Sequence, residues 1–473
     1  MYFRFHHLVV LLALGLSHDA RAMDWSRCYS NIFGAISHPH KNEWQDLNQK
    51  FQFQRENLLT KNPGAYGTQF KDVGFASPGQ MEELKPFHDR PFFLSSETGR
   101  ERLKAVRIGL SWDQKSLSRE VFSDYLKVMD EIPNFDLYVS YKPESILKNG
   151  VRSKGVPLNV QKIMSQAKSS IQKRVHFLQD DLESNSVVWT QDGSKPLIGK
   201  NLSTLATTTH PKRPEYLQIL QEYDHAKLIE TSKTTLFFEG GDVVVGDRHI
   251  FTGTETIKRM MSKYKITRPN AKKILEAEWG KPVFEVGTTI TGQGSLTRAI
   301  DYHIDLTMAS AYNHATNKET ILLGSYQSLL DQLKTIPESE FKTAREKELI
   351  KFISDPENIS HLADRELQVE ALEKDLIAQG YDVIKVPNVI EATTKKDVPK
   401  LNYTNVIFTG NQMIFPENGI RAIDAHMKKV YQGLGYQPVP VKVVQKSMQL
   451  EGGIRCLSET YRHSDVRIPQ HQK

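Results

Sequence analysis

Cysteine is scarce in this chain, which has only 2 cysteines among 473 residues. A scaffold held together by disulfides would have more of them. In an oxidising compartment the two could form one disulfide, or one thiol could be kept for chemistry, and both alternatives stay open. Two common zinc-binding patterns, His-Glu-x-x-His and paired Cys-x-x-Cys, are also missing. We therefore expect neither a metal nor another cofactor.

Long apolar runs are missing as well. The run from Leu8 to Leu16 is shorter than the roughly 20 residues that a membrane span requires. It follows a basic start and precedes small residues at Ala20 and Ala22, a pattern typical of a signal peptide. The sequence therefore predicts a signal peptide over residues 1–22, cleaved after Ala22. We expect a secreted or periplasmic protein without stable membrane association after cleavage.

The chain has no strong excess of charge of one sign. The formal net charge is +6 for 473 residues, and the lysines and arginines are scattered rather than clustered. This disfavours nucleic acid as a partner, because nucleic-acid-binding domains concentrate basic residues on one surface. With 39% hydrophobic and 25% charged residues, the composition is that of an ordinary globular protein.

The organisation of the sequence changes near residue 105. Residues 23–104 are polar with weak periodicity and predict an irregular N-terminal extension. After them, AVRIGLSW (105–112) predicts a strand, REVFSDYLKVMDEI (119–132) has the spacing of a helix, and FDLYVSY (135–141) alternates as a strand does. These three elements form a β-α-β unit.

Similar small units recur up to the C-terminus. They include strand pairs such as NVIFTGNQMIFP (405–416), each followed by a helical run and another strand. Such repetition suggests a radial arrangement of short sheets. We expect one catalytic α/β domain over residues 105–473, with the charged stretch 338–380 as a solvated helical insertion.

Five short stretches could contribute to a functional site. WTQDGSKP (189–196) places Asp192 after a strand, either as a turn former or as a carboxylate that binds a cation. FFEGGDVVVG (237–246) has two glycines between Glu239 and Asp242, which permit close approach of another group. These carboxylates could also be ordinary charged ends of a hairpin.

The third stretch is YHIDLTMAS (302–310). In an extended segment His303 and Asp305 would lie on one face, as proton carrier and cation holder, although a structural histidine also fits. LNYTNVIFTGNQMIFP (401–416) is explained mainly by turn chemistry. In EGGIRCLSE (451–459), Cys456 follows two glycines and is either a nucleophile, a buried thiol or the partner of Cys28 in a disulfide.

Together these stretches resemble the guanidino-group-modifying enzyme superfamily. FFEGGDVVVG and GGIRCLS are similar to arginine deiminases and amidinotransferases, whereas WTQD and NVIFTGNQMIFP are similar to peptidylarginine and agmatine deiminases. The resemblance covers roughly residues 105–458. It implies a five-bladed pseudosymmetric α/β propeller, the pentein fold, with the site in its central channel.

The resemblance also implies roles for individual residues. Asp192 and Asp305 would bind a guanidinium group, Glu239 would hold His303, and Cys456 would attack the guanidinium carbon; Asp242 and Trp189 are secondary candidates. The expected activity is a hydrolase (deiminase) that releases ammonia from arginine or a derivative, as a small molecule or in a peptide. Alternatives are an amidinotransferase, a non-catalytic guanidinium-binding protein, and a metal hydrolase built on His303, Asp305 and Cys456. The oligomeric state stays open.

Overall fold

The computed structural model describes most of the region from residue 93 onward, together with one earlier helix. The described residues are 41–61, 93–110, 115–141, 158–179, 189–191, 194–198, 203–207, 230–233, 238–290, 296–298, 303–389, 400–448 and 452–462. The predicted signal peptide (1–22), Cys28 and Asp192 lie outside them. Among the helices described, none combines the length and the apolar character that a membrane span requires.

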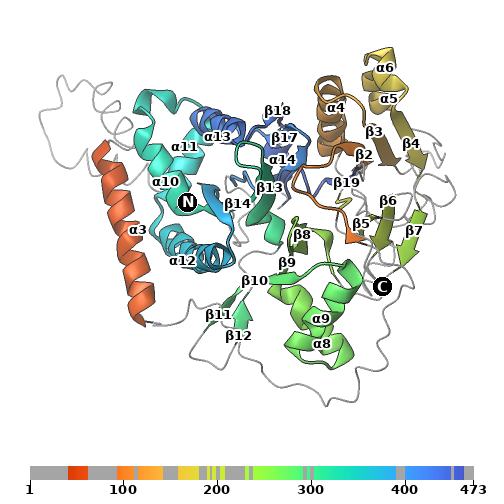
Figure 1. Cartoon of the computed structure of the whole chain (residues 1–473). Helices are drawn as coiled ribbons and strands as arrows, with labels where there is room; N and C mark the ends of the chain where they lie inside the picture. The colour runs from red at the N-terminus through yellow and green to blue at the C-terminus, as the bar shows by residue number, and fades with distance from the viewer. Residues whose placement is uncertain are drawn as a thin grey trace, which may run out of the picture.

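The described strands form six sheets, and five of these sheets share one plan (Figure 1). In each of the five, a first strand runs antiparallel to a second, and a third runs parallel to the second. The mixed α/β character predicted from the sequence is confirmed. The sixth is a hairpin of β11(Thr288–Ile290) and β12(Leu296–Arg298).

Two of the five sheets come from the first half of the repeated region. One contains β5(Ser194–Ile198), β6(Ser203–Thr207) and β7(Glu230–Lys233), with β1(Phe93–Leu94) added at its edge. The next contains β8(Val243–Val245), β9(Ile250–Gly253) and β10(Val283–Val286); its connecting helices are α8(Thr254–Tyr264) and α9(Arg268–Trp279).

Two further sheets follow along the chain. The first contains β13(Met308–Asn313), β14(Lys318–Ser325) and β15(Asp382–Pro387), connected through α10(Tyr326–Thr335), α11(Ala344–Ile353) and α12(Pro356–Ala378). The second contains β16(Ile407–Thr409), β17(Gln412–Pro416) and β18(Gln437–Val441), connected through α13(Arg421–Gly433). Residues 338–380, predicted to be a solvated helical insertion, contain α11 and α12, and α12 buries one face that includes Leu362, Val369 and Leu372.

The fifth sheet joins the two ends of the repeated region. Its order is β19(Ser458–Arg462), β2(Leu103–Leu110), β3(Asp136–Tyr141), β4(Val175–Gln179), and α4(Lys115–Glu131), α5(Leu158–Ser165) and α6(Ser169–Gln172) connect its later strands. The short helix α14(Val444–Ser447) lies between β18 and β19. Because β19 pairs with β2, the C-terminal part of the chain is fixed beside the start of the repeated region.

Helical periodicity explains how the helices cover the sheets. In α13 the buried apolar residues Ile423, Met427 and Tyr431 recur every four positions and therefore share one face. Each buried side chain of this size stabilises the fold by about 1.5–3 kcal/mol relative to exposure. They join a core cluster that also contains residues of β16, β17, α10 and α11.

The N-terminal extension is more ordered than the sequence predicted. Part of it forms α3(Lys41–Lys61), which packs beside α10 and α12 (Figure 1). The helix is polar overall, so periodicity gave a weak signal, but Leu47 and Phe51 are buried in the same core cluster as α10. Tertiary packing thus stabilises a helix that its own sequence does not specify strongly.

Residues 93–102, which we call the strap, contact all five sheets in succession. Their backbone bonds to β5 at Pro196, to β8 at Val245 and to β13 at Tyr312, and it accepts bonds from side chains next to β18 and on β19. In Figure 1 the strap is the orange segment between β5 and β2, near the middle of the molecule. The strap therefore links sheets that are far apart in sequence.

Tyr436 tests the contribution of the strap to stability. Its hydroxyl lies 2.8 Å from Thr98 O on the strap and 2.7 Å from Tyr312 O. We expect Tyr436→Phe to lower the free energy of unfolding by about 1–2 kcal/mol, because buried carbonyl groups lose a donor. Urea unfolding measures this change. As a control, Tyr312→Phe removes a hydroxyl whose bond to Asn317 is solvent-exposed and should cost less than about 0.5 kcal/mol; equal losses would contradict the prediction.

Candidate active site

The candidate residues precede the first strand of their sheets. Glu239 lies before the 3₁₀ turn Gly240–Asp242 that leads into β8, and His303 lies before the turn Ile304–Leu306 that leads into β13. Cys456 lies in the turn that leads into β19. Since the three sheets share one plan, these equivalent positions come together in space.

His303 and Glu239 form the first contact of the site. His303 Nε2 lies 3.0 Å from Glu239 Oε2, and the His303 side chain is 3% exposed. The second carboxylate oxygen of Glu239 lies 3.9 Å from Arg259 Nη1. The carboxylate therefore fixes the orientation of the imidazole ring.

The two glycines after Glu239 allow this close approach. A Cβ atom on Gly241 would lie 2.3 Å from His303 Nδ1, and one on Gly240 would lie 1.8 Å from Gln191 O. Both distances are shorter than non-bonded atoms tolerate. The sequence predicted that these glycines allow close approach of another group. At Gly241 that group is the ring of His303.

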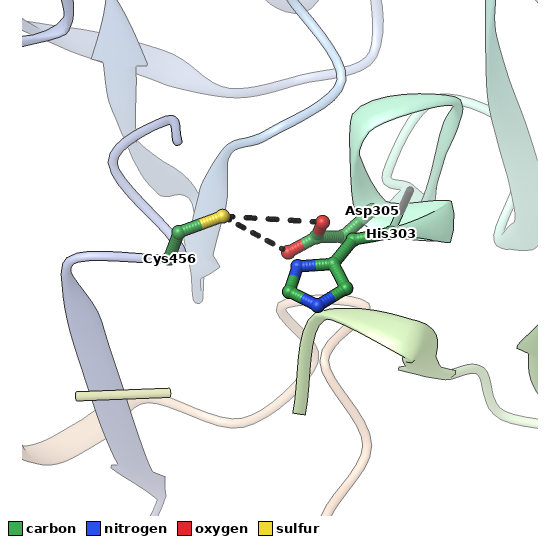
Figure 2. Close-up of side chains that lie close together, drawn as sticks. All are labelled: His303, Asp305 and Cys456. Atoms are coloured by element: carbon green, nitrogen blue, oxygen red, sulfur yellow. Dashed lines mark hydrogen bonds between the residues drawn. The ribbon is translucent and has the colours of Figure 1, made fainter. Parts of the chain in front are cut away.

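Asp305 and Cys456 form the second contact. Asp305 Oδ2 lies 3.7 Å and Oδ1 4.0 Å from Cys456 Sγ, and Asp305 is fully buried. Figure 2 shows the Asp305 carboxylate and the His303 ring on the same side of the sulfur. The sequence analysis attributed the closeness of His303 and Asp305 to an extended segment. Instead, only His303 is extended, and Asp305 is brought beside it by the 3₁₀ turn.

Asn405 also belongs to the site, although the sequence analysis assigned it to turn chemistry. Its Nδ2 donates to Cys456 Sγ at 3.4 Å, and its Oδ1 accepts from the backbone N–H of Arg455 at 2.7 Å. A Cβ atom on Gly453 would lie 2.3 Å from Asn405 Oδ1, so this glycine too serves close packing. One feature of the sequence could have located Asn405, namely its position. Asn405 lies shortly before β16, as Cys456 lies shortly before β19.

A network of buried charges lies next to Asp305. Arg455 Nη1 is 3.6 Å from Asp305 Oδ2, and Arg455 Nη2 donates to Glu97 Oε2 at 2.5 Å. Lys195 Nζ donates to Glu97 Oε1 at 2.9 Å. Burial raises the pKa of Glu97, but the Arg455 and Lys195 charges outweigh it and hold that pKa at about 2. Burial, reinforced by Arg455, lowers the pKa of Lys195 to about 8.

Gln191 fills the space between these groups. With its amide nitrogen facing Asp305, that nitrogen lies 3.0 Å from Asp305 Oδ2, and the amide oxygen lies 2.9 Å from Arg455 Nε and 3.1 Å from Lys195 Nζ. In this orientation the amide gives every neighbour a complementary partner. Asp192, the adjacent candidate for substrate binding, lies outside the described residues.

The secondary candidates Asp242 and Trp189 pack beside the turns that form the site. The Asp242 carboxylate accepts from the Thr256 hydroxyl and would contact a Cβ on Gly253, so it faces α8 and β9. Trp189 is partly buried, and a Cβ on Gly452 would lie 2.1 Å from its ring. Both residues pack the walls around the turns that hold Glu239 and Cys456.

Three side chains could together bind a metal ion. One ligand atom each from His303, Asp305 and Cys456 lies within 4.8 Å of the other two. Imidazole, carboxylate and thiolate are ligands that zinc accepts. The same three groups are also the ones that thiol-based chemistry on a cation would need.

The structure matches those of guanidino-group-modifying enzymes, in agreement with the resemblance of the motifs. Agmatine deiminase from C. jejuni is 12% identical with a TM-score of 0.53, over 80% of this chain and 99% of that chain. A cysteine-to-serine variant of that enzyme with substrate bound is 13% identical with a TM-score of 0.52, over the same shares. A protein from Porphyromonas gingivalis assigned as an arginine deiminase is 14% identical with a TM-score of 0.51, over 78% and 98%. No protein-family model and no curated protein sequence matches the chain.

The titration of Asp242 gives a test of the packing around the site. Burial raises the pKa of Asp242 to about 6, although the Thr256 hydroxyl, His303 and Arg259 lower it. Since this pKa lies above the ordinary value of 3.8 for an aspartate, the group's stabilising contribution is complete below about pH 4 and is lost as the pH rises through about 6. Because the pKa is raised by about two pH units, the free energy of unfolding falls by on the order of 3 kcal/mol.

We therefore expect Asp242→Asn, which stays neutral, to gain stability relative to the parent between about pH 4 and pH 7. Urea unfolding of both proteins at the two pH values measures the gap, and titrating groups that do not interact with Asp242 cancel in the difference. A gap that does not change with pH would contradict the burial of an ionisable Asp242.

Proposed function

We propose that the protein is a cysteine-dependent hydrolase that acts on the guanidinium group of arginine or an arginine derivative and releases ammonia. One observation supports this most directly. Cys456 Sγ, the carboxylate of Asp305 and the ring of His303, itself bound to Glu239, lie together although they come from three sheets. A thiol, a proton carrier and a buried carboxylate are the groups that hydrolysis of a cationic carbon centre requires.

The buried carboxylate provides the binding part of the proposal. A guanidinium group is planar and donates parallel hydrogen bonds, which suit a carboxylate. Asp305 would accept one such pair of bonds from the substrate, and Asp192 would accept another. The substrate's positive charge beside the sulfur would also stabilise the thiolate form of Cys456.

The reaction would proceed in two halves. The Cys456 thiolate attacks the guanidinium carbon, the tetrahedral adduct forms, and protonated His303 gives its proton to the departing nitrogen, so that ammonia leaves. A planar thiouronium remains bonded to the sulfur. Neutral His303 then takes a proton from water and the hydroxide adds to the same carbon. The C–S bond breaks as the new hydroxyl group loses its proton to solvent, which gives a neutral ureido product, the thiolate and protonated His303.

Asn405 would assist both halves of this reaction. Its amide N–H donates to the sulfur, and such a bond favours the thiolate over the neutral thiol. The side chain cannot rotate easily, because its carbonyl oxygen accepts from the Arg455 backbone. Asn405 would therefore keep the leaving and attacking sulfur in one position.

The comparison structures support the reaction class. The C. jejuni enzyme that shares this fold is an agmatine deiminase, and its cysteine-to-serine variant holds substrate. The replacement of a cysteine by serine in the substrate-bound form of such an enzyme is consistent with the role proposed for Cys456. We further propose that the five sheets close into a five-bladed propeller around the site, because they share one plan and the strap contacts all of them.

Turnover by the parent and by Cys456→Ser tests the proposal. The parent should release ammonia and a ureido product from at least one of free arginine, agmatine, methylated arginine or peptidyl-arginine, and Cys456→Ser should lose at least about 10³-fold in kcat, because the hydroxyl is a far weaker nucleophile. Ammonia assays and mass spectrometry of the product measure this. Each assay is repeated with glycine as acceptor amine and with EDTA.

Four outcomes would redirect or contradict the proposal. Amidino transfer to the amine would identify an amidinotransferase, and loss of activity with EDTA would favour the metal set of His303, Asp305 and Cys456. Undiminished ammonia release by Cys456→Ser would contradict the nucleophile. Guanidine binding without turnover would point to a non-catalytic binding protein.

Gly241→Ala tests the position of His303 without removing any catalytic group. The new methyl group would lie 2.3 Å from His303 Nδ1, so the ring has to move away from its contact with Glu239. Since proton transfer by a positioned histidine contributes about 10²- to 10⁴-fold, kcat should fall at least about 10²-fold. The matched control is Gly433→Ala, where nothing lies within 4 Å of the new atom. Parent-like kcat in both variants would contradict the role of His303.

A further inference from the structure

Glu97 is a largely buried carboxylate, with 15% of its side chain exposed, that enters the site from the strap. Its two oxygens accept from Arg455 Nη2, Lys195 Nζ and the backbone N–H of Val245, at 2.5, 2.9 and 2.8 Å. All these partners are themselves buried. Glu97 lies in the stretch that the sequence analysis placed outside the catalytic domain, and no motif pointed to it.

The two cations that Glu97 binds also face Asp305. Arg455 Nη1 lies 3.6 Å from Asp305 Oδ2, and the Asp305 charge acts on Lys195 as well. Arg455 donates its shorter hydrogen bonds elsewhere, to Glu97 and to Val243 O at 2.8 Å. Asp305 is therefore near both cations without being their main hydrogen-bond partner.

A count of charges shows what Glu97 changes. With Glu97, the group formed by this carboxylate and the buried Asp305, Arg455 and Lys195 contains two negative and two positive charges. Without Glu97, Asp305 alone would face two cations. A cationic substrate would then have to bind Asp305 against a net positive charge in a buried site, where Coulomb interactions are strong.

We propose that Glu97 is a positioning residue that makes Asp305 available to a cationic substrate by binding Arg455 and Lys195. This inference rests on the proposed function, in which Asp305 binds a guanidinium group. It assigns the strap a part in substrate affinity in addition to its structural contacts. Glu97 acts through Arg455 and Lys195, so it touches neither the substrate nor the sulfur.

Opposite effects of two substitutions in one ion pair test this inference. We expect Glu97→Gln to raise KM for the cationic substrate about tenfold or more, with a smaller change in kcat, because a buried positive charge loses its partner. Lys195→Met removes a positive charge beside Asp305 and should leave KM unchanged or lower it. The double variant Glu97→Gln/Lys195→Met should return KM most of the way to the parent value.

A purely structural ion pair gives a different pattern. Both single variants would then raise KM together, and the double variant would be as impaired as either one; this result would overturn the inference. The neutral ureido product gives a further readout, because its inhibition constant should change less than threefold in Glu97→Gln if charge is the cause. An equal loss of affinity for neutral product and cationic substrate would also overturn it.

A matched control separates charge from general damage to the fold. Glu285 is likewise a buried glutamate paired with an arginine, Arg268, but it lies on β10, the strand of its sheet farthest from β8. Glu285→Gln should lower thermal stability and leave KM at the parent value. Glu97→Gln leaves Lys195 without its carboxylate partner and could therefore fail to fold. Lys195→Met and the double variant lack this lysine, so their KM values still show the direction in which the charge acts.

Failure of this inference can be told apart from failure of the proposed function. The parent is assayed first, and absence of turnover on every guanidine contradicts the hydrolase proposal alone. In that case the dissociation constant of agmatine, measured by calorimetry for the parent and for each variant, replaces KM. We expect the variants to rank in the same order as they would by KM. Parent-like affinity of Glu97→Gln for the cation contradicts the inference, whatever the parent turns over.

Discussion

The antiparallel ladder between β19 and β2 is the interaction on which the site depends. It pairs Ser458 with Ile108 and continues to Arg462, so that strands from opposite ends of the repeated region form one sheet. Cys456 lies in the turn immediately before this ladder, and the turn is fixed further by the bond from the Arg455 N–H to Asn405. Any loss of register in the ladder would therefore displace the sulfur from Asp305. The thiol, although near the C-terminus, has a position as well determined as that of a residue in the core.

Close contact between the backbones of neighbouring turns is the second requirement for the site. The turns before β8 and β19 each contain paired glycines, and a methyl group at Gly240, Gly241, Gly452 or Gly453 would collide with a neighbouring turn or side chain. The turns can therefore approach one another until side chains from different sheets are within hydrogen-bond distance. The strap adds to this by bonding to the backbone of successive sheets. Glycines, which have no side chain, thus allow a densely packed site. The space that side chains at these positions would fill is occupied by His303, Gln191, Trp189 and Asn405.

Sequence patterns predicted the parts of the structure that local physics determines. The helical period of α4 and the apolar residues of β2 and β3 are encoded within each segment, and the predicted β-α-β unit is present. Glycine pairs and a His-x-Asp spacing located Glu239, His303, Asp305 and Cys456, which the structure brings together. Asn405 and Glu97 were not located, because their functional contacts are made with Cys456, Arg455 and Lys195, which are distant in sequence. A lone asparagine or glutamate carries no local signal of such partners. α3 was missed for a related reason, since its order comes from packing on α10 and α12.

The distribution of hydrogen bonds around Arg455 explains how a buried carboxylate can be paired and still accept a ligand. A buried charge without a partner costs several kcal/mol, so Asp305 needs a nearby cation in the resting protein. A cation that donated its best hydrogen bonds to Asp305 would occupy the oxygens that a guanidinium must reach. Arg455 avoids this conflict because its Nη2 donates to Glu97 and Val243, while Nη1 remains 3.6 Å from Asp305. At that distance the Coulomb attraction is largely kept, whereas the directional hydrogen bond is not formed. The carboxylate is thereby stabilised by the charge of Arg455, while the amide nitrogen of Gln191, 3.0 Å from Oδ2, is its neutral hydrogen-bond partner.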